Sequence, residues 1–194
     1  LRLVKGAYWD SEIKKSHTLG DIDFPVFTKK INTDYSFLVC SQKLLRMRNN
    51  IFPQFASHNA HSLVSICEMA GNSEGYEVQR LHGMGESLHH IISKKYGVDS
   101  RVYAPIGSHK ELLAYLMRRL LENGANSSFI NHLFDENISP ESLASDVFSS
   151  VEQDPEKSHS KIQLPKDIYI NSHQNSRSVI LTEQLDVDQL YEEQ

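Results

Sequence analysis

Four side chains on one predicted helix have the types and the spacing of an anion-binding surface. Tyr115, Arg118, Arg119 and Glu122 follow one another at i, i+3, i+4 and i+7, which places them on one face of a helix over residues 111–126. Paired guanidinium groups suit a bidentate grip on a carboxylate or a phosphate. The alternative interpretation is a solvated helix face on which Glu and Arg side chains pair with one another.

Further cations and aromatic rings interrupt segments that otherwise have the pattern of a protein core. Arg2 and Lys5 lie in a strand-like apolar run, and a buried cation requires a partner. The complete set comprises the cations Arg2, Lys5, His58, Arg118 and Arg119 and the aromatic residues Tyr8, Trp9, Tyr103 and Tyr115. Because the set contains almost no carboxylates, it favours the binding of a planar anionic ligand over hydrolysis.

Other chemical motifs in the sequence are weak. The ten histidines form no HExxH motif and have no paired carboxylates with them, so no metal site is predicted. The Gly-x-Gly within residues 82–87 lacks the third glycine of a dinucleotide fingerprint, which favours a tight turn. Residues 28–30, Thr-Lys-Lys, precede a predicted helix, where anions bind well, and a solvated charge pair is the alternative.

Composition and charge indicate an ordinary globular domain. Of the 194 residues, 39% are hydrophobic and 23% are charged. The net charge of −5 arises entirely in residues 151–194, which hold 9 acidic and 4 basic residues, so no basic surface favours nucleic acid. No apolar run reaches the roughly 18 residues of a membrane-spanning helix. Cys40 and Cys67 are predicted to be buried thiols in a reducing compartment.

The elements that must position these residues alternate between extended and helical patterns. Extended runs are predicted at residues 1–9, 24–30, 52–59, 76–85 and 100–107. Helices are predicted at residues 10–20, 32–50, 60–71, 86–97 and 111–126. The expected cap and stop residues are Asn32 or Thr33, Ser108 with Glu111, Gly71, Gly97 and Gly124. This rhythm is typical of parallel strands covered by helices, in a doubly wound sheet or a (β/α)₈ barrel.

Residues capable of chemistry follow the ends of several predicted strands, which favours the barrel. They are Lys5 and Gly6, Ser57, His58 and Asn59, Leu81 and His82, and Tyr103. Barrel active sites are built at the carboxyl ends of several strands. About four βα units make half a barrel. We therefore expect an α/β fold with the C-terminal half of a (β/α)₈, TIM-like barrel over residues 1–127, a helical extension over 128–151 and a linker over 152–194.

Long segments of the chain, in sequence order, carry a family resemblance. The segments RLVKGAYWD (2–10), FASHNA (55–60), YEVQRLHGMGE (76–86) and RVYAPIGSHKELLAYLMRRLLENGANSSF (101–129) resemble the proline dehydrogenase domain of bifunctional proline utilization A. The resemblance continues to about residue 150. The segment LPKDIY (164–169) resembles the linker toward that family's second domain, an aldehyde dehydrogenase.

The resemblance implies an activity, cofactors and partners. It implies a barrel that binds FAD and oxidises L-proline to Δ1-pyrroline-5-carboxylate by hydride transfer to the flavin. Electrons would then pass to a membrane quinone, through peripheral contact of a cytoplasmic enzyme with the inner membrane. NAD would serve only the aldehyde dehydrogenase domain, which is absent from this chain and completes the conversion to glutamate.

Positions in the matching motifs imply the roles of single residues. The residues implied to bind the substrate, with the arginine pair on its carboxylate, are Arg118, Arg119, Tyr115, Tyr103, Leu81 and Tyr8. The residues implied to bind the cofactor are Arg2, Val4, Lys5, Gly6, Ala7, Trp9, Thr28, Lys29, Lys30, Ser57, His58, Asn59, Gln79 and Glu122. Among them, residues 28–30 and 57–59 are implied to contact the phosphate and adenosine side.

The chain also departs from the family pattern. Ser57 stands where the family usually has Thr, and Lys29 stands where Arg is common. The first four βα units of the family are missing, and with them a substrate-binding lysine. We therefore expect a fragment that is inactive alone and is completed by an N-terminal half-barrel in its parent or in a separate chain. The alternatives are a phosphate-binding barrel enzyme such as an aldolase, and a non-catalytic remnant of a split gene.

Overall fold

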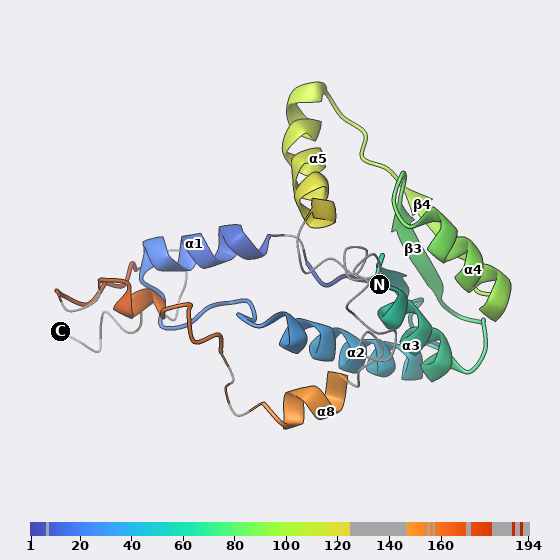
Figure 1. The fold of residues 1–194 in the computed structure, drawn as a ribbon, viewed down its shortest axis with the longest axis horizontal. Coiled ribbons are helices and arrows are strands. Elements are labelled where there is room, and N and C mark those ends of the chain that lie inside the picture. Colours follow the sequence, from blue (N-terminus) through green and yellow to red (C-terminus); the bar gives the residue numbers. More distant parts are fainter. Residues whose placement is uncertain are drawn as a thin grey trace, which may run out of the picture. The chain divides into compact units, whose positions relative to one another are not determined.

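The computed structural model describes residues 1–6, 8–124, 147–154, 156, 158–169, 172–179, 188 and 191. The chain forms two compact units (Figure 1). The first comprises Leu1–Ala7 and Ile31–Asp154, and the second comprises Tyr8–Lys30 and Pro155–Gln194. Each unit is described by itself.

A parallel sheet of four strands organises the first unit. The strands lie in the order of the sequence: β1 (Arg2–Leu3), β2 (Gln54–Ala56), β3 (Glu77–Leu81) and β4 (Ser100–Tyr103). All three strand pairs are parallel. Because parallel neighbours need a crossover, helices connect the strands, and the predicted α/β alternation is confirmed.

Helix starts and stops in this unit follow local sequence signals. Helices α3 (Ala60–Ala70) and α4 (Glu86–Tyr96) end at Gly71 and Gly97, whose φ angles of 68° and 70° lie in the left-handed region that glycine tolerates. Helix α5 (His109–Gly124) begins after Ser108, whose backbone N–H and hydroxyl both donate to Glu111. The predicted helix stops at Gly71 and Gly97 are confirmed. Of the predicted capping box, the structure shows the half in which the Glu111 carboxylate accepts from Ser108.

The hydrophobic core lies between one face of the sheet and helices α2 (Lys30–Arg46), α3 and α4 (Figure 1). Phe55 and Val78 are fully buried on that sheet face, and Leu63 and Ile66 of α3 are fully buried against them. The helix α8 (Val147–Glu152) adds Val147 to the same cluster. It lies within and just beyond the predicted helical extension, whose other residues fall outside the described part of the chain.

Three local predictions were wrong. The first strand covers only Arg2–Leu3. Gly6, with φ 100°, and a helix that begins at Trp9 exclude an extended run through residue 9. Residues 24–30 form no strand. Helix α2 begins at Lys30, so Asn32 and Thr33 lie inside it, a difference that helix boundaries commonly show.

A fourth prediction, on the thiols, was half right. Cys67 is buried, and burial raises its pKa. Cys40 is exposed, because the buried stripe of α2 runs through Phe37, Leu38 and Ser41 and turns residue 40 outward. Both cysteines are free thiols.

The second unit contains helix α1 (Trp9–Leu19) and the 3₁₀ helix η1 (Pro165–Asp167). Asn175 Nδ2 donates to the carbonyl oxygens of His17 and Pro165 and so ties these two elements together. The predicted helix over residues 10–20 is confirmed, and it ends at Gly20 in the left-handed conformation. Among the described residues, no helix has both the length and the apolar content needed to cross a bilayer.

Candidate functional site

The sheet face opposite the core is polar. Side chains alternate between the two faces of a strand, and the strand register aligns one set across all four strands. This set, which we call the polar face, comprises Arg2, Gln54, Glu77, Gln79, Arg101 and Tyr103, together with Ala56 and Leu81. Barrel interiors are usually filled by branched apolar side chains, so such a face indicates a binding function.

A chain of hydrogen bonds runs across the polar face. The carboxylate of Glu77 accepts from Arg101 Nε and Nη2, both at 2.7 Å. Gln54 Nε2 and Gln79 Nε2 donate to Glu77 Oε1 at 2.7 and 2.8 Å. The Arg101 guanidinium, followed by the two amides, holds the pKa of Glu77 at about 2, against the effect of burial. Glu77 is therefore a buried, ionised acceptor.

Arg2 connects this chain to the carboxyl ends of the strands. Its Nε donates to Gln79 Oε1 at 2.8 Å, and its guanidinium lies 4.5 Å from the centroid of the Tyr103 ring. Burial raises the pKa of Tyr103, and the charges of Arg2 and Arg119 act in the opposite direction. Tyr103 thus lies within electrostatic reach of an arginine on β1 and another on α5.

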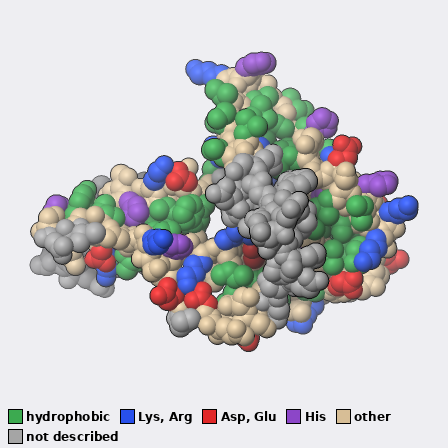
Figure 2. Space-filling view, in the orientation of Figure 1, with side chains coloured by type: hydrophobic (Ala, Val, Ile, Leu, Met, Phe, Trp, Pro, Cys, Tyr) green, Lys and Arg blue, Asp and Glu red, His purple; other side chains and the backbone are tan. Residues whose placement is uncertain are grey.

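Helix α5 has its polar face turned inward and its apolar face exposed. Tyr115, Arg118 and Arg119 are half-buried, and the Nε of Arg118 and the Nη1 of Arg119 are inaccessible to solvent. Leu113 and Leu121, in contrast, are 62% and 66% exposed. Hydrophobic side chains accordingly gather on the visible surface of α5 (Figure 2).

This orientation favours one of the two interpretations of the helix. A solvated polar face would leave the arginines exposed, whereas Arg118 and Arg119 are half-buried. Arg119 also lies 4.4 Å from the centroid of the Tyr115 ring, one turn away on the same helix. The inward-facing cationic surface is therefore the better description. Glu122 belongs to α5, and its side chain lies outside the described part of the structure.

The loop after β1 combines a paired cation with open backbone. Lys5 Nζ forms an ion pair with Asp34 of α2 and lies 5.4 Å from the centroid of the Phe37 ring. Gly6 has φ 100°, and a Cβ atom placed on it would meet nothing within 4 Å. Val4 is 46% exposed beside them. A ligand can therefore approach this backbone closely. Ala7 lies outside the described residues.

Two histidines, His58 in the loop after β2 and His89 on α4, form hydrogen bonds through their ring nitrogens near the end of β2. His58 Nε2 accepts the backbone N–H of Leu81 at 3.0 Å, so the neutral ring carries its proton on Nδ1. His89 of α4 lies between the Ser57 carbonyl oxygen, 2.9 Å from Nε2, and the Ser100 hydroxyl, 2.8 Å from Nδ1. Burial lowers the pKa of His89, which favours its neutral form.

The side chain of Asn59 has a structural task. Its Oδ1 accepts the backbone N–H of Ser62 at 3.0 Å and so caps helix α3. The carboxyl end of β2 is thereby fixed by a helix cap and by the hydrogen bond from His89 to Ser57. Contacts within the chain therefore hold residues 57–59 in place.

The structure brings most of the predicted site residues to one unit. Around the polar face and the strand ends of the first unit lie Arg2, Val4, Lys5, Gly6, Ser57, His58, Asn59, Gln79, Leu81, Tyr103, Tyr115, Arg118 and Arg119. Reasoning from the sequence missed Glu77, Gln54, Asp34 and His89. The alternation of side chains along β3 would have placed Glu77 and Gln79 on one face, but no signal in the neighbouring sequence identifies their partners on the other strands.

Five predicted residues, Tyr8, Trp9, Thr28, Lys29 and Lys30, belong to the second unit. Trp9 Nε1 donates to the Phe27 carbonyl oxygen at 2.9 Å. Thr28 Oγ1 accepts the backbone N–H of His159 at 2.9 Å. Lys29 Nζ donates to the carbonyl oxygen of Glu156 at 2.7 Å. The segment after residue 155 therefore orders the Thr-Lys-Lys loop within this unit.

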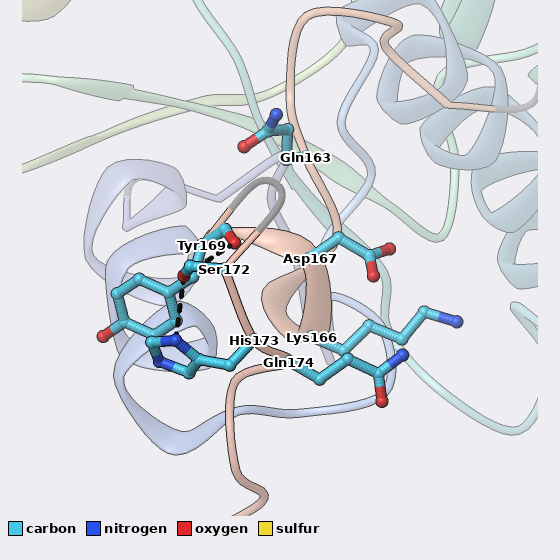
Figure 3. A pocket seen from close by; sticks show the side chains of 7 residues that line it. All are labelled: Gln163, Lys166, Asp167, Tyr169, Ser172, His173 and Gln174. Atoms are coloured by element: carbon cyan, nitrogen blue, oxygen red, sulfur yellow. Dashed lines mark hydrogen bonds between the residues drawn. The ribbon is translucent and has the colours of Figure 1, made fainter.

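The second unit also contains an open pocket of about 470 Å³ (Figure 3). Its lining comprises Gln163, Lys166, Asp167, Tyr169, Ser172, His173 and Gln174. The Tyr169 and His173 rings stack at 4.6 Å, and Ser172 Oγ lies 2.8 Å from His173 Nδ1. None of the lining residues is a predicted site residue. Among the described residues, no three His, Cys, Asp or Glu side chains gather as a metal ion would require.

Comparison with known sequences gives a consistent result. The sequence profile of the family described as "Proline dehydrogenase" matches residues 1–132. The bifunctional protein PutA of Klebsiella aerogenes is 47% identical over 195 residues, which covers 93% of this chain and 15% of that protein. PutA of Escherichia coli strain K12 is 46% identical over the same coverage. The chain thus spans 15% of the length of these curated relatives.

Comparison with solved structures supports the fold. A crystal structure of a variant of Bradyrhizobium japonicum proline utilization A matches with a TM-score of 0.88 at 46% identity, covering 97% of this chain and 20% of that one. The four-stranded parallel sheet and its helices are therefore part of a TIM-barrel type domain, and the predicted fold class is confirmed. The predicted boundaries at residues 127 and 151 stay a prediction.

Proposed function

Because this chain belongs to the proline dehydrogenase family, we propose that it supplies the carboxyl-terminal part of an FAD-dependent site that oxidises L-proline to Δ1-pyrroline-5-carboxylate. The observation that carries the proposal is the inward-facing pair Arg118 and Arg119, half-buried on α5 with buried guanidinium nitrogens. A soluble helix normally turns its apolar face inward. A helix that turns two arginines inward instead is suited to an anionic substrate group.

The residues of the first unit fit the flavin chemically. Arg2 and Lys5 supply cationic donors, Gln79 supplies an amide, and the open backbone at Gly6 permits close approach of a planar ring. Cations beside a flavin favour its negatively charged reduced form, since opposite charges attract. When bound, FAD accepts the hydride that leaves the proline ring, which protein side chains cannot do.

The chain's own residues have defined tasks in this proposal. Arg118 and Arg119 bind the proline carboxylate through charge-assisted hydrogen bonds, which orient the ring. Tyr103, Tyr115 and Leu81 form walls that exclude water from the ring. Arg2 is held in place by Gln79 and Tyr103, and its charge would stabilise the reduced flavin.

We extend the proposal to the second unit and to the partners. Thr28, Lys29 and Lys30 would bind the phosphate side of FAD, where hydroxyl and ammonium groups suit a pyrophosphate. The electron acceptor would be a membrane quinone, reached by peripheral contact at the inner membrane from the cytoplasm. The sequence resemblance supports both extensions.

The test uses the full-length protein that contains this segment. Purified protein should absorb as a flavoprotein, take up FAD after flavin removal and reduce an artificial dye when proline is added. The control variant is Lys14→Ala, which removes an exposed lysine of α1 that forms an ion pair with Asp10, one helical turn away, and it should behave as the wild type does. Colourless protein that takes up no FAD would contradict the proposal, and tight binding of sugar phosphates by such protein would favour a phosphate-binding barrel enzyme.

A further inference from the structure

Glu77 is a buried carboxylate to which the proposed function assigns no task. Only 3% of its surface is exposed. It is the first residue of β3 and lies on the same face of the strand as Gln79, two residues later. Its partners come from three strands: Gln54 on β2, Gln79 on β3 and Arg101 on β4. A buried charge with this many partners is costly to replace, so a task beyond core filling is expected.

The hydrogen bonds of Glu77 have a direction. A carboxylate can only accept, so it selects the NH₂ end of the Gln79 side-chain amide, at 2.8 Å. The carbonyl end of the same amide must then point away from Glu77. It accepts Arg2 Nε at 2.8 Å. The ionised carboxylate therefore decides which end of Gln79 faces Arg2.

The same chain fixes the guanidinium of Arg2. Its Nε donates to Gln79, and its Cζ lies over the Tyr103 ring at 4.5 Å from the centroid. A reversed Gln79 amide would present NH₂ to Arg2 Nε, which is also a donor, and two donors repel each other. Loss of the Glu77 charge would thus release Arg2 without touching Arg2 itself.

We propose that Glu77 is a positioning residue of the proposed oxidoreductase, which sets the orientation of Arg2 at the flavin through the side-chain amide of Gln79. The inference rests on the proposed function, since it needs a flavin beside Arg2. The competing explanation is that Glu77 only anchors Arg101 and stabilises the sheet. The two explanations differ in whether removing the Glu77 charge changes the absorption spectrum and the reduction potential of the flavin.

The main variant is Glu77→Gln in full-length holoprotein, because it keeps the shape and removes only the fixed acceptor. The matched control is Glu68→Gln on α3, which removes an exposed carboxylate that accepts the Tyr96 hydroxyl at 2.8 Å. The measurements are FAD content, the visible absorption spectrum, the flavin reduction potential, the kinetics of proline oxidation and the free energy of unfolding.

We expect Glu77→Gln to shift the flavin absorption bands and the reduction potential. We also expect a fall in kcat of roughly 10-fold, the equivalent of one charge-assisted hydrogen bond, with the KM for proline unchanged. The control Glu68→Gln should leave all flavin properties at the wild-type values. The exchange variant Glu77→Gln with Gln79→Glu restores a carboxylate that accepts from an amide and from Arg2. Its flavin absorption bands and reduction potential should lie nearer to the wild-type values than those of Glu77→Gln alone.

Each outcome is decisive. If Glu77→Gln lowers only the free energy of unfolding and leaves the spectrum and potential unchanged, the anchoring explanation holds and the inference is wrong. An exchange variant no better than Glu77→Gln would also overturn it. Should Glu77→Gln fail to fold, Glu77→Asp, which keeps the charge but shortens its reach to Gln79, must shift the flavin absorption bands relative to wild type, and an unchanged spectrum in folded Glu77→Asp protein would overturn the inference. Wild-type protein that lacks flavin and proline oxidation would refute the proposed function instead.

Discussion

The two faces of the one parallel sheet have opposite character. Toward helices α2, α3 and α4, the strands present Phe55 and Val78, which are fully buried in a cluster without charged side chains. The polar face presents arginines, amides and the buried carboxylate of Glu77, joined by hydrogen bonds of 2.7 to 2.8 Å. Because successive side chains of a strand point to opposite faces, the same four strands can form a hydrophobic core on one side and a polar surface on the other.

The difference shows where stability and binding reside in this fold. Burial of apolar surface stabilises the core face and is insensitive to pH and ligands. A polar face must satisfy every buried group, and it gains little net stability from doing so. Such a face is retained where a ligand needs fixed charges. Substitutions on the core face should therefore change folding, and substitutions on the polar face should change binding.

The largest effect is expected on the core face. Phe55→Ala leaves a cavity beside Leu63 and Ile66 and should lower the free energy of unfolding by about 3–5 kcal/mol. Chemical denaturation of full-length protein measures this loss. The flavin spectrum of the fraction that stays folded should match that of the wild type. A changed spectrum in folded Phe55→Ala protein would break the separation of the two faces.

The next effect concerns the substrate carboxylate. Arg118→Met or Arg119→Met removes charge-assisted hydrogen bonds worth about 1.5–3 kcal/mol, so kcat/KM for proline should fall roughly 10- to 150-fold. Lysine should rescue only in part, because it lacks the planar fork. Steady-state kinetics and the binding of a carboxylate analogue that cannot be oxidised measure the effect. Unchanged analogue affinity in both variants would restore the solvated-face interpretation of α5.

A smaller effect follows from the ionisation of Glu77. Its pKa of about 2 lies below the ordinary 4.5, because Arg101 and the two amides favour the charged form. Its contribution is therefore complete above pH 4.5 and is lost as the pH falls toward 2. The shift corresponds to about 3 kcal/mol, and with Arg101 open to solvent we expect roughly half of that.

The measurement for Glu77 is a comparison of unfolding across pH. The difference in unfolding free energy between wild type and Glu77→Gln should be constant near neutral pH and should shrink through the acid range. The control Glu68→Gln tests whether removal of an exposed glutamate charge reproduces this pH dependence. A Glu77→Gln difference that grows on acidification would contradict the assigned charge state.

The smallest effect separates a cap from a ligand contact. Asn59→Ala removes the acceptor for the Ser62 N–H and should destabilise the protein by about 1 kcal/mol. If the cap is the main task of this side chain, FAD content should stay near the wild-type value. Asn59→Ser, which preserves capping, should recover most of the stability. A large loss of FAD in Asn59→Ser would show that the amide contacts the cofactor directly.

Part of this structure follows from the sequence alone. The glycine stops at Gly71 and Gly97 and the Ser108–Glu111 capping box are local signals, and the helices obey them. The i, i+3, i+4 spacing of Tyr115, Arg118 and Arg119 is likewise local, and these side chains do share one face. Periodicity and capping involve neighbours in sequence, which is why they can be read without a fold.

The rest of the site depends on contacts between distant residues. Glu77 and Arg101 are 24 positions apart and meet only because β3 and β4 pair in one register. Asp34 reaches Lys5 only because α2 crosses back over the strand end. Local patterns also failed at the first strand, which the apolar residues extend to Trp9 but which ends at Leu3, before the positive φ of Gly6.

The most direct test of the account is an anaerobic titration of full-length holoprotein with L-proline, followed by the visible absorbance of the flavin. The account predicts that proline bleaches the flavin bands and that Arg119→Met shifts the bleaching to higher proline concentrations. Phe55→Ala protein that remains folded should bleach at the wild-type concentrations. Flavin that stays oxidised at every proline concentration, or equal bleaching in wild type and Arg119→Met, would contradict the claim that the polar face and α5 form the proline site.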